Sequence, residues 1–241
     1  PNKILKLIFK YIDNYALKNV DKVVVNSDDL KNYLIKKRKI TSNKINVVNH
    51  FSPFIKSNYE PNYELNNIFY AGNTGRPQNL SAFLRYFDKY FPSDWKLDIY
   101  GAGQEFNNLS QFTNKNIRIN NYQERKKLEN LTKDIPFALI SLDYEITFEG
   151  FPGKTFDYLN MNKVLINFSN PNSVVSKLID KYGLGFNIDS NDPESLKGKL
   201  EDMKSSNEIS KILENIKYFQ KRISNKEIAF KSYLELISTS S

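Results

Sequence analysis

The sequence predicts an α/β fold, a Rossmann-like parallel sheet with helices on both faces, and three observations support this class. From residue 67 onward, short apolar runs alternate with segments of helical length, which is the pattern of strand–helix–strand units. The suggestive polar and glycine-containing loops follow the apolar runs, at the strand ends where ligands of parallel sheets bind. The chain has 241 residues, which is enough for a substantial core and for one large or two small domains.

Each strand is expected at a short apolar run, and the helices are expected in the segments between these runs. The expected strands are residues 22–25, 45–48, 68–71, 97–100, 117–119, 137–142, 164–168 and 185–188. The expected helices are residues 4–17, 28–36, 80–90, 124–131, 174–181, a segment opened by Pro152, and the C-terminal region. Ser27 is a good N-cap for the helix that starts at Asp28, because its hydroxyl can accept a hydrogen bond from the first turn.

A polar segment at residues 53–66 contains two prolines and several asparagines and is interpreted as a linker. It separates an N-terminal part, residues 1–52, from the regular strand–helix alternation of residues 67–222. Residues 223–241 are expected to form a C-terminal helix that packs back on the N-terminal part.

The composition narrows the classes of ligand and chemistry. Lys and Arg number 35 against 27 Asp and Glu, for a net charge of +8, which favours anionic partners such as nucleotides. Cysteine is absent, which excludes disulfides, a thiol nucleophile and a cysteine zinc site. No apolar run reaches the roughly 18 residues of a membrane-spanning helix, and no signal peptide is recognised. The lysines are spread along the chain without an aromatic–basic motif, so nucleic acid is not an expected partner.

The most informative segment is residues 149–159, which lies between two expected strands. Pro152 suits the first position of a helix, where its missing N–H is not needed. The free N–H groups of such a helix start can hold an anion, and Lys154 adds a positive charge beside them. Asp157 follows one turn later, where its carboxylate can accept hydrogen bonds from sugar hydroxyls. This set of groups predicts a site for a phosphate joined to a ribose.

Two glycine-containing loops follow expected strands. Residues 72–77 combine glycines, which allow close backbone approach, with Arg76, which can bind phosphate in a bidentate way. Taken alone, this loop favours a plain strand-to-helix turn. Gly101 and Gly103 begin a dinucleotide-binding fingerprint, but Phe106 stands where its third glycine belongs. An NAD site is therefore disfavoured. A nucleotide-binding turn of another kind and a plain tight turn explain the two glycines about equally well.

Glu149, seven intervening residues and Asp157, followed by the apolar run at residues 164–168, resemble the donor-site motif of GT-B fold glycosyltransferases, in particular the family 4-like enzymes. Pro152 and Lys154 fit the sublineage that has Pro-x-Lys before the second acid. The pattern around Lys154 is fairly specific, whereas the glycine turns, which fall in the family's order, are not.

The resemblance extends over essentially the whole chain and implies a two-part organisation. Residues 67–222 correspond to the nucleotide-sugar-binding, Rossmann-like C-terminal domain of the family. Residues 1–52 correspond to the last part of the N-terminal, acceptor-side domain. The rest of that domain has no counterpart, which leaves open a shortened chain or a second chain that supplies it.

The resemblance also implies roles for individual residues. Arg76 and Lys154 would neutralise the diphosphate of a nucleotide-sugar, Tyr122 would border the base, and Asp157 would bind the ribose hydroxyls. Glu149 would face the donor sugar as the catalytic residue. Without the resemblance, a tyrosine such as Tyr122 more often simply covers a helix end. The further residues implied in nucleotide-sugar binding are Gly72, Asn73, Gly101, Gly103, Gly153 and Thr155.

The implied reaction is glycosyl transfer without a bound metal or other cofactor, in which cations and a helix N-terminus stabilise the leaving nucleoside diphosphate. Relatives with the Pro-x-Lys pattern favour a UDP-sugar as the donor. The acceptor would be a surface polysaccharide, a lipid-linked glycan or a protein in a bacterium, and the location cytoplasmic, at the inner face of the membrane if the basic and apolar leading helix contacts lipid. Ordinary packing of that helix on its domain is the favoured alternative.

The chain departs from the family pattern at several positions. The second acid is Asp157 where glutamate is usual, and Asn162 replaces the customary glycine before the strand. His50 is the single histidine of the chain and is interpreted as structural. Two other function classes stay open: a non-catalytic partner subunit of a glycosyltransferase, and, less favoured, a nicotinamide-binding oxidoreductase.

Overall fold

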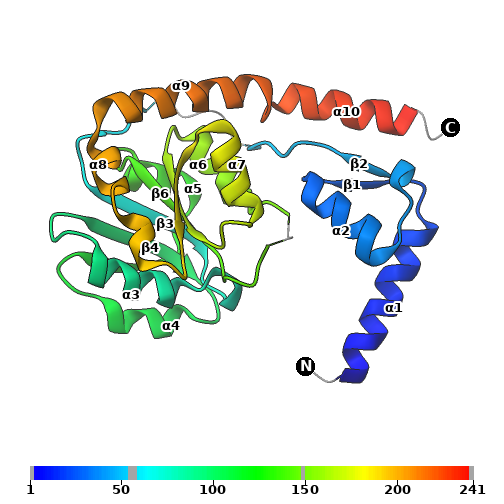
Figure 1. Ribbon diagram of the computed structural model, residues 1–241, viewed down its shortest axis with the longest axis horizontal. Coiled ribbons are helices and arrows are strands. Elements are labelled where there is room, and N and C mark those ends of the chain that lie inside the picture. Colours follow the sequence, from blue (N-terminus) through cyan, green and yellow to red (C-terminus); the bar gives the residue numbers. More distant parts are fainter. Residues whose placement is uncertain (1–2, 54–58, 148–149, 239–241) are drawn as a thin grey trace.

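The computed structural model describes residues 3–53, 59–147 and 150–238. These residues form two separate sheets, each made of parallel strands, with helices around them (Figure 1). The N-terminal unit, residues 3–53, contains α1 (Lys3–Asn19), β1 (Val23–Val25), α2 (Asp28–Arg38) and β2 (Ile45–Val47). The larger unit begins at β3 and contains β3 (Asn67–Asn73), α3 (Leu80–Tyr90), β4 (Lys96–Ala102), α4 (Phe106–Leu109), β5 (Ile117–Asn121), α5 (Arg125–Thr132), β6 (Phe137–Ser141), α6 (Gly153–Asn160), β7 (Val164–Ser169), α7 (Val174–Tyr182), β8 (Gly185–Asp189), α8 (Lys199–Lys204) and α9 (Ser206–Arg222). A final helix, α10 (Lys226–Ser238), follows α9.

The larger sheet has the strand order β5-β4-β3-β6-β7-β8, and every neighbouring pair is parallel. The chain builds outward from β3 through β4 to β5, returns to β6 on the other side of β3, and builds outward again. The strand order therefore reverses between β3 and β6. Loops that leave these two strands separate to opposite faces, so a crevice forms at the carboxyl ends of the strands.

The strands are buried because helices cover both faces of the sheet. Every residue of β6 and of β7 is buried. In Figure 1, α3 and α4 lie below the sheet, whereas α6 and α7 lie above it. Helix α9 packs across α6 and α7 through Ile209, Ile212, Ile216 and Phe219, which recur at helical spacing and are buried. This arrangement fixes α6 between the sheet and α9.

The centre of the sheet is not a continuous ladder. β3 pairs with β6 at Ile68 and Phe69, whereas it pairs with β4 along its whole length. Beyond Phe69 the side of β3 that faces β6 is covered by Tyr158 of α6. The Tyr158 hydroxyl accepts from the Ala71 N–H at 2.8 Å and donates to the Ala71 carbonyl at 2.9 Å. A buried phenol thus satisfies the two backbone groups that a neighbouring strand would otherwise pair.

The N-terminal unit has a core of its own, but a small one. Val25, Leu34, Ile40 and Ile45 are its buried apolar residues. Ser27 caps α2 by accepting from the Leu30 N–H at 3.1 Å, which confirms the expected start of that helix. Helix α1 extends away from this core (Figure 1) and exposes most of its large apolar side chains. No helix in the described part of the chain is long and apolar enough to cross a membrane.

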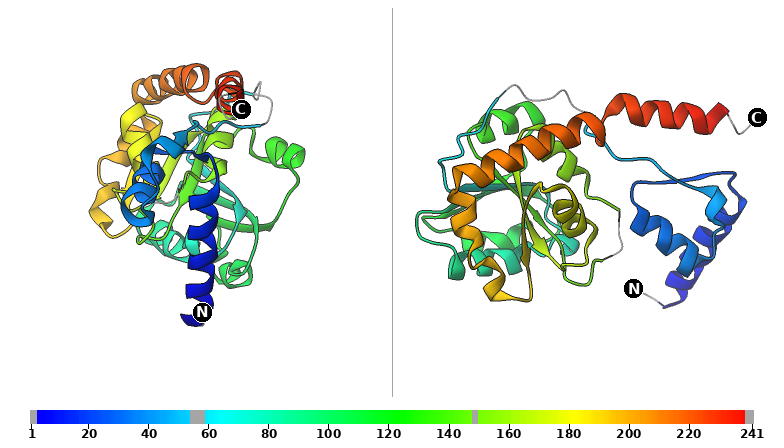
Figure 2. Two further views of the ribbon diagram at one scale, coloured as in Figure 1. Left: turned by 90° about the vertical axis from the view of Figure 1, so that its right-hand side faces the viewer. Right: turned by 45° about the horizontal axis from the view of Figure 1, so that its top comes forward.

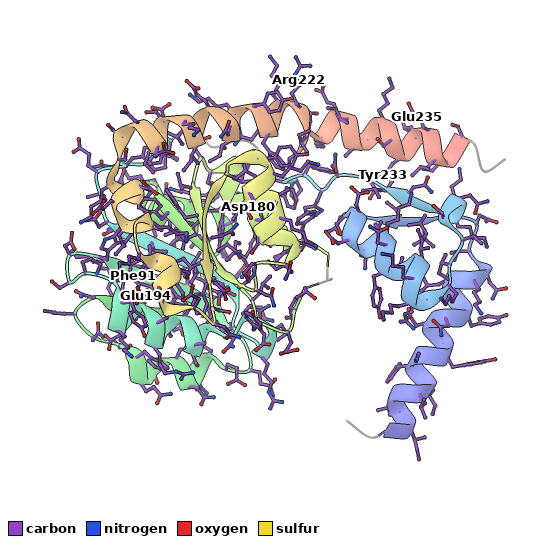
Figure 3. The ribbon with its side chains drawn as sticks, viewed as in Figure 1. Phe91, Asp180, Glu194, Arg222, Tyr233 and Glu235 are labelled. Carbon is purple, nitrogen blue, oxygen red and sulfur yellow. The ribbon has the colours of Figure 1, made fainter. Side chains whose placement is uncertain are left out.

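Helix α10 continues the direction of α9 and extends over the N-terminal unit (Figure 2). The Lys22 ammonium donates to the Leu236 carbonyl at 2.6 Å. Tyr233, labelled in Figure 3, lines a hollow together with Val24 and Val25 of β1. The division of the chain into an N-terminal part, a linker, a larger domain and a C-terminal helix that packs back stays a prediction.

The expected fold class is confirmed, and every expected strand and helix is present; where bounds were expected, the ends differ by at most two residues. Two local features differ. Pro152 is the N-cap of α6 and not its first helical residue, with φ of −60° and ψ of 126°, because proline restricts the residue's own φ but leaves ψ extended at a cap. The four-residue helix α4 was not expected from the sequence.

Lys163 is a structural lysine inside the larger unit. Its side chain is 1% exposed, and its ammonium donates to the carbonyls of Thr132, Lys133 and Ile135 at 2.6, 3.0 and 2.8 Å. These carbonyls lie at and after the C-terminus of α5, where a helix leaves backbone acceptors without partners. Burial lowers the pKa of Lys163 to about 7, and Asp134 opposes this shift.

We expect Lys163→Met to lower the free energy of unfolding by about 2–4 kcal/mol, because three buried carbonyls lose their donor. Removal of the buried ammonium offsets part of this loss. Urea titration followed by circular dichroism measures this difference. Lys197→Met is the matched control, since the Lys197 side chain is 83% exposed, and it should leave stability unchanged. A Lys163→Met protein as stable as the wild type would contradict the capping role.

Candidate functional site

A cavity of about 210 Å³ opens at the carboxyl ends of β3 and β4, beside the point between β3 and β6 where the strand order reverses. It is bounded by the end of β3, the loop between β5 and α5, and one side of α6. Its lining residues are Ala71, Gly72, Tyr100, Tyr122, Gln123, Arg125, Leu128, Lys154, Asp157, Tyr158 and Met161.

The start of α6 lies at this cavity. Pro152 forms the N-cap and has no N–H, and its carbonyl accepts from the Thr155 N–H at 3.0 Å. The N–H groups of Gly153 and Lys154 belong to the first turn, where a helix has no internal acceptors for them. A helix N-terminus with free N–H groups favours an anion. Tyr158, one turn further along, ties the same helix to β3.

Lys154 and Arg125 are the two basic residues that line the cavity in the part of the chain that the structure describes. The Lys154 Nζ atom is buried and has no hydrogen-bond partner among the described residues. It lies 3.7 Å from the centroid of the Tyr70 ring, a cation–π contact that compensates only part of the lost hydration. Burial lowers the pKa of Lys154 to about 7. A buried ammonium without a hydrogen-bonded partner is costly for the free protein, and an anionic ligand in the cavity would relieve that cost.

Gly72 lies next to this lysine, in a backbone conformation that favours glycine. A Cβ atom at Gly72 would lie 2.9 Å from Lys154 Nζ, and the backbone φ of 133° is itself unfavourable for other residues. Gly101 and Gly103 have a different explanation. A Cβ on either would collide with the neighbouring loop, at Thr74 for Gly101 and at Asn73 for Gly103. Close packing between the ends of β3 and β4 therefore accounts for glycine at both positions without a ligand.

Asp157 is held from two sides. The Ser52 hydroxyl donates to Asp157 Oδ1 at 2.7 Å. Arg125 places Nη1 at 3.6 Å from Asp157 Oδ2 and also donates from Nε to Glu129 at 2.5 Å. The Asp157 side chain is 24% exposed, so the carboxylate stays accessible from the cavity.

His50 lies beside the same helix. Its ring contacts Phe156 edge-on, with centroids 4.8 Å apart. Its Nε2 atom lies 3.7 Å from the point where a Cβ atom added to Gly153 would be. Burial lowers the pKa of His50, and the charge of Asp157 opposes this shift. The contact with Phe156 fits the structural role expected for this histidine. His50 also lies close to the start of α6.

The structure brings together four of the residues that the sequence singled out. Gly72, Tyr122, Lys154 and Asp157 line one cavity, with Tyr122 64% exposed at its rim. Gly153 lies at the start of α6. Thr155 is fully buried, and its hydroxyl has no hydrogen-bond partner in the described part of the chain.

Arg76, Asn73 and Glu149 are placed differently. Arg76 is 78% exposed, lies 3.6 Å from Glu105, and is not among the described residues that line the cavity. Asn73 belongs to the loop that packs against Gly103, and its carbonyl accepts from the Tyr70 hydroxyl. Glu149, the expected catalytic residue, lies outside the described residues.

Sequence reasoning missed Arg125, Tyr158 and Tyr100 as parts of the cavity. Arg125 had a usable signal, because it is a cation at the start of the helix that follows β5, on the same edge of the sheet as the other strand ends. Tyr158 and Tyr100 had none, because an aromatic residue in a helix or strand is usually a core residue. Tyr158 reaches β3 because β6 no longer pairs with β3 beyond Phe69.

The geometry bears on dinucleotide binding and on metal binding. Phe106 begins the four-residue helix α4, which is too short to hold the pyrophosphate of a dinucleotide at a stable helix N-terminus. Among the described residues, no group of three or more His, Cys, Asp or Glu could hold a metal ion. Transfer without a metal nevertheless stays a prediction.

No protein-family profile matches this sequence, and no curated protein matches it. Solved structures do resemble it. An S. aureus TarM mutant in complex with fondaparinux, α-GlcNAc-glycerol and UDP has a TM-score of 0.73 at 12% identity, over 93% of this chain and 46% of the TarM chain. A glycosyltransferase from Rickettsia africae ESF-5 has a TM-score of 0.69 at 18% identity, over 98% of this chain and 66% of its own. Anabaena HepE in complex with UDP and glucose has a TM-score of 0.74 at 9% identity, over 91% of this chain and 64% of HepE.

These similarities show the fold, which is the GT-B fold that the sequence predicts. The identities are too low to show more than the fold. The chain also spans only about half to two thirds of the length of these structures.

We expect Tyr158→Phe to lower the free energy of unfolding by about 1–3 kcal/mol, because the Ala71 N–H and carbonyl lose their buried partner while the ring stays in place. Tyr122→Phe is the control, since this tyrosine is exposed, and its removal of one hydroxyl should leave the urea midpoint unchanged. If both variants unfold at the wild-type midpoint, β3 does not depend on the Tyr158 hydroxyl.

Proposed function

We propose that this chain contains the donor-binding part of a glycosyltransferase and that its cavity binds the UDP moiety of a nucleotide-sugar. The observation that carries the proposal is the buried Lys154 ammonium, without a hydrogen-bonded partner among the described residues, at the N-terminus of α6. It lies at the edge of the sheet where parallel folds bind nucleotides. Two of the structures with the same fold, TarM and HepE, contain UDP.

The charges of the cavity suit a leaving diphosphate. In glycosyl transfer the bond between the sugar and the diphosphate breaks, and negative charge grows on the diphosphate oxygen. Lys154 and the first N–H groups of α6 would stabilise that charge, since the fold holds them in place and the lysine ammonium is buried. Arg76 would add a second cation, but from its exposed position it must leave Glu105 to do so.

The rest of the nucleotide finds groups of suitable chemistry in the same cavity. Tyr122 at the rim offers an aromatic face to a base. The Asp157 carboxylate can accept hydrogen bonds from the ribose hydroxyls while it keeps its bond to Ser52, because a carboxylate has about four acceptor positions. Glu149 remains the proposed residue facing the sugar.

The finer parts of the proposal follow from the resemblance to the family 4-like enzymes with a Pro-x-Lys motif. The acceptor would be a glycan, a lipid-linked glycan or a protein, and transfer would need no metal or cofactor. An acceptor-side domain, from the same or a second polypeptide, would complete the enzyme in the cytoplasm or at the membrane surface. A non-catalytic partner that keeps only the fold is the alternative.

Calorimetric titration of UDP, GDP, ADP and NAD into the purified chain tests the donor site. We expect UDP to bind most tightly, with the same affinity in the presence and absence of Mg²⁺. Lys154→Met should raise the dissociation constant of UDP by about 10–100-fold, the usual worth of a hydrogen bond to a charged group. Lys197→Met, an exposed lysine, is the control and should bind as the wild type does.

Other outcomes would change the proposal. Preferential binding of NAD would support the oxidoreductase, and an affinity for UDP that depends on Mg²⁺ would exclude the metal-independent site. If no nucleotide binds, the non-catalytic partner becomes the better explanation.

We expect the affinity for UDP to weaken as the pH rises above 7. The pKa of Lys154 in the free protein is about 7, and a bound diphosphate favours the charged ammonium and raises that pKa. Below pH 7 the lysine is already charged, so affinity gains nothing further from it. Above pH 7 binding must take up a proton, so the dissociation constant should rise by up to about tenfold per pH unit.

Titration between pH 7 and 9 isolates this effect, because the terminal phosphate of UDP, with a pKa of about 6, is fully ionised there. Lys154→Met should bind weakly with no slope over this range. A wild-type slope that persists in Lys154→Met would assign the proton to another group.

A further inference from the structure

Asp157 lies between the nucleotide cavity and a second hollow, and residues from different parts of the chain contact its two carboxylate oxygens. Arg125, which approaches Oδ2, lines the nucleotide cavity. Ser52, which donates to Oδ1, lines a separate hollow on the other side of α6, together with Phe156 and Gln220. The carboxylate therefore presents Oδ2 toward the cavity, while Oδ1 is occupied from behind.

Ser52 comes from the segment that leads out of the N-terminal unit. This segment follows β2 and is docked on α6 at two consecutive helical residues. His50 packs edge-on against Phe156, and Ser52 donates to Asp157. A second contact joins the two units nearby, where Lys177 of α7 donates to Asp29 of α2 at 2.6 Å. The position of the Ser52 hydroxyl thus depends on how the N-terminal unit is seated against the larger unit.

A carboxylate with one oxygen fixed has a defined direction for its remaining acceptor positions. Aspartate has few rotatable bonds, and its terminal torsion is broad unless a contact fixes it. The bond from Ser52, at 2.7 Å, has the short length of a hydroxyl that donates to an ionised acceptor. With Oδ1 held, Oδ2 keeps a fixed position in the cavity, which lowers the entropy lost when it binds a hydroxyl.

We propose that Ser52 is a positioning residue for donor recognition. Its hydroxyl orients Asp157 so that Oδ2, which lies beside Arg125, accepts from the ribose hydroxyls. Nucleotide affinity then depends on the docking of the segment that joins the two units. This proposal rests on the proposed function, because it assumes that the cavity binds a ribonucleotide.

The test compares UDP with 2′,3′-dideoxy-UDP, which lacks the hydroxyls that Asp157 would bind. The wild type should bind UDP at least about tenfold more tightly than the dideoxy nucleotide, as expected for a hydrogen bond to a charged group. In Ser52→Ala this ratio should fall to about threefold or less, while the dissociation constant of the dideoxy nucleotide stays nearly unchanged. Ser52→Thr keeps the hydroxyl and should keep the wild-type ratio.

Ser110→Ala is the matched control, because the Ser110 hydroxyl is exposed and donates only to the nearby Asn107 carbonyl in the described structure. It should leave both affinities unchanged. Hydrogen exchange provides a second readout. UDP should slow exchange in a peptide that covers residues 45–53 of the wild type and of Ser52→Thr, and should not do so in Ser52→Ala.

The outcomes separate this inference from the proposed function. If Ser52→Ala keeps the wild-type ratio, or weakens both nucleotides equally, Ser52 does not position Asp157 and the inference is wrong while UDP binding stands. If the wild type binds both nucleotides equally, Asp157 is not the ribose acceptor and the inference fails with that assignment. If UDP does not bind at all, the proposed function itself is wrong.

Discussion

The divergence of β6 from β3 determines what the centre of this molecule can hold. The two strands pair only at their amino ends, and further along a helix side chain replaces the missing strand. Tyr158 fills the place with a hydroxyl that both accepts from and donates to Ala71. Because a backbone left without partners in the core is costly, this contact fixes α6 against β3. The start of α6 and its lysine are thereby fixed at the carboxyl ends of the strands.

Two buried lysines show how the same group can serve the fold or a ligand. Both have a pKa lowered to about 7 by burial. The ammonium of Lys163 donates to three backbone carbonyls at the end of α5 and is satisfied by the protein itself. The ammonium of Lys154 meets an aromatic face and no described acceptor. Since a buried charge without hydrogen bonds is unfavourable, the second lysine is the one whose environment is completed by an anion.

The connection between the two units passes through the candidate site. Helix α6 presents Lys154 and Asp157 to the cavity. Phe156 and Asp157 of the same helix contact His50 and Ser52 of the segment that leaves the N-terminal unit. Helix α10 returns over that unit, and its Leu236 carbonyl accepts a hydrogen bond from the Lys22 ammonium. A nucleotide bound at α6 would therefore act on groups that also join the two units, which gives a physical route from donor binding to their relative position.

The sequence by itself determined the α/β class and the positions of the strands and helices, and it predicted a phosphate-type site around Lys154. These are local properties, since apolar runs, cap residues and a proline-led helix act within a few residues. The tertiary structure alone decided which of the suggested residues meet. Arg76 and Lys154 both looked like phosphate ligands, but one lies in solvent and the other in the cavity. Ser52 and Tyr158 gained their roles from contacts with residues 105 and 87 positions away. Such contacts depend on where β6 leaves β3 and on how the linker docks, and no short-range pattern encodes them.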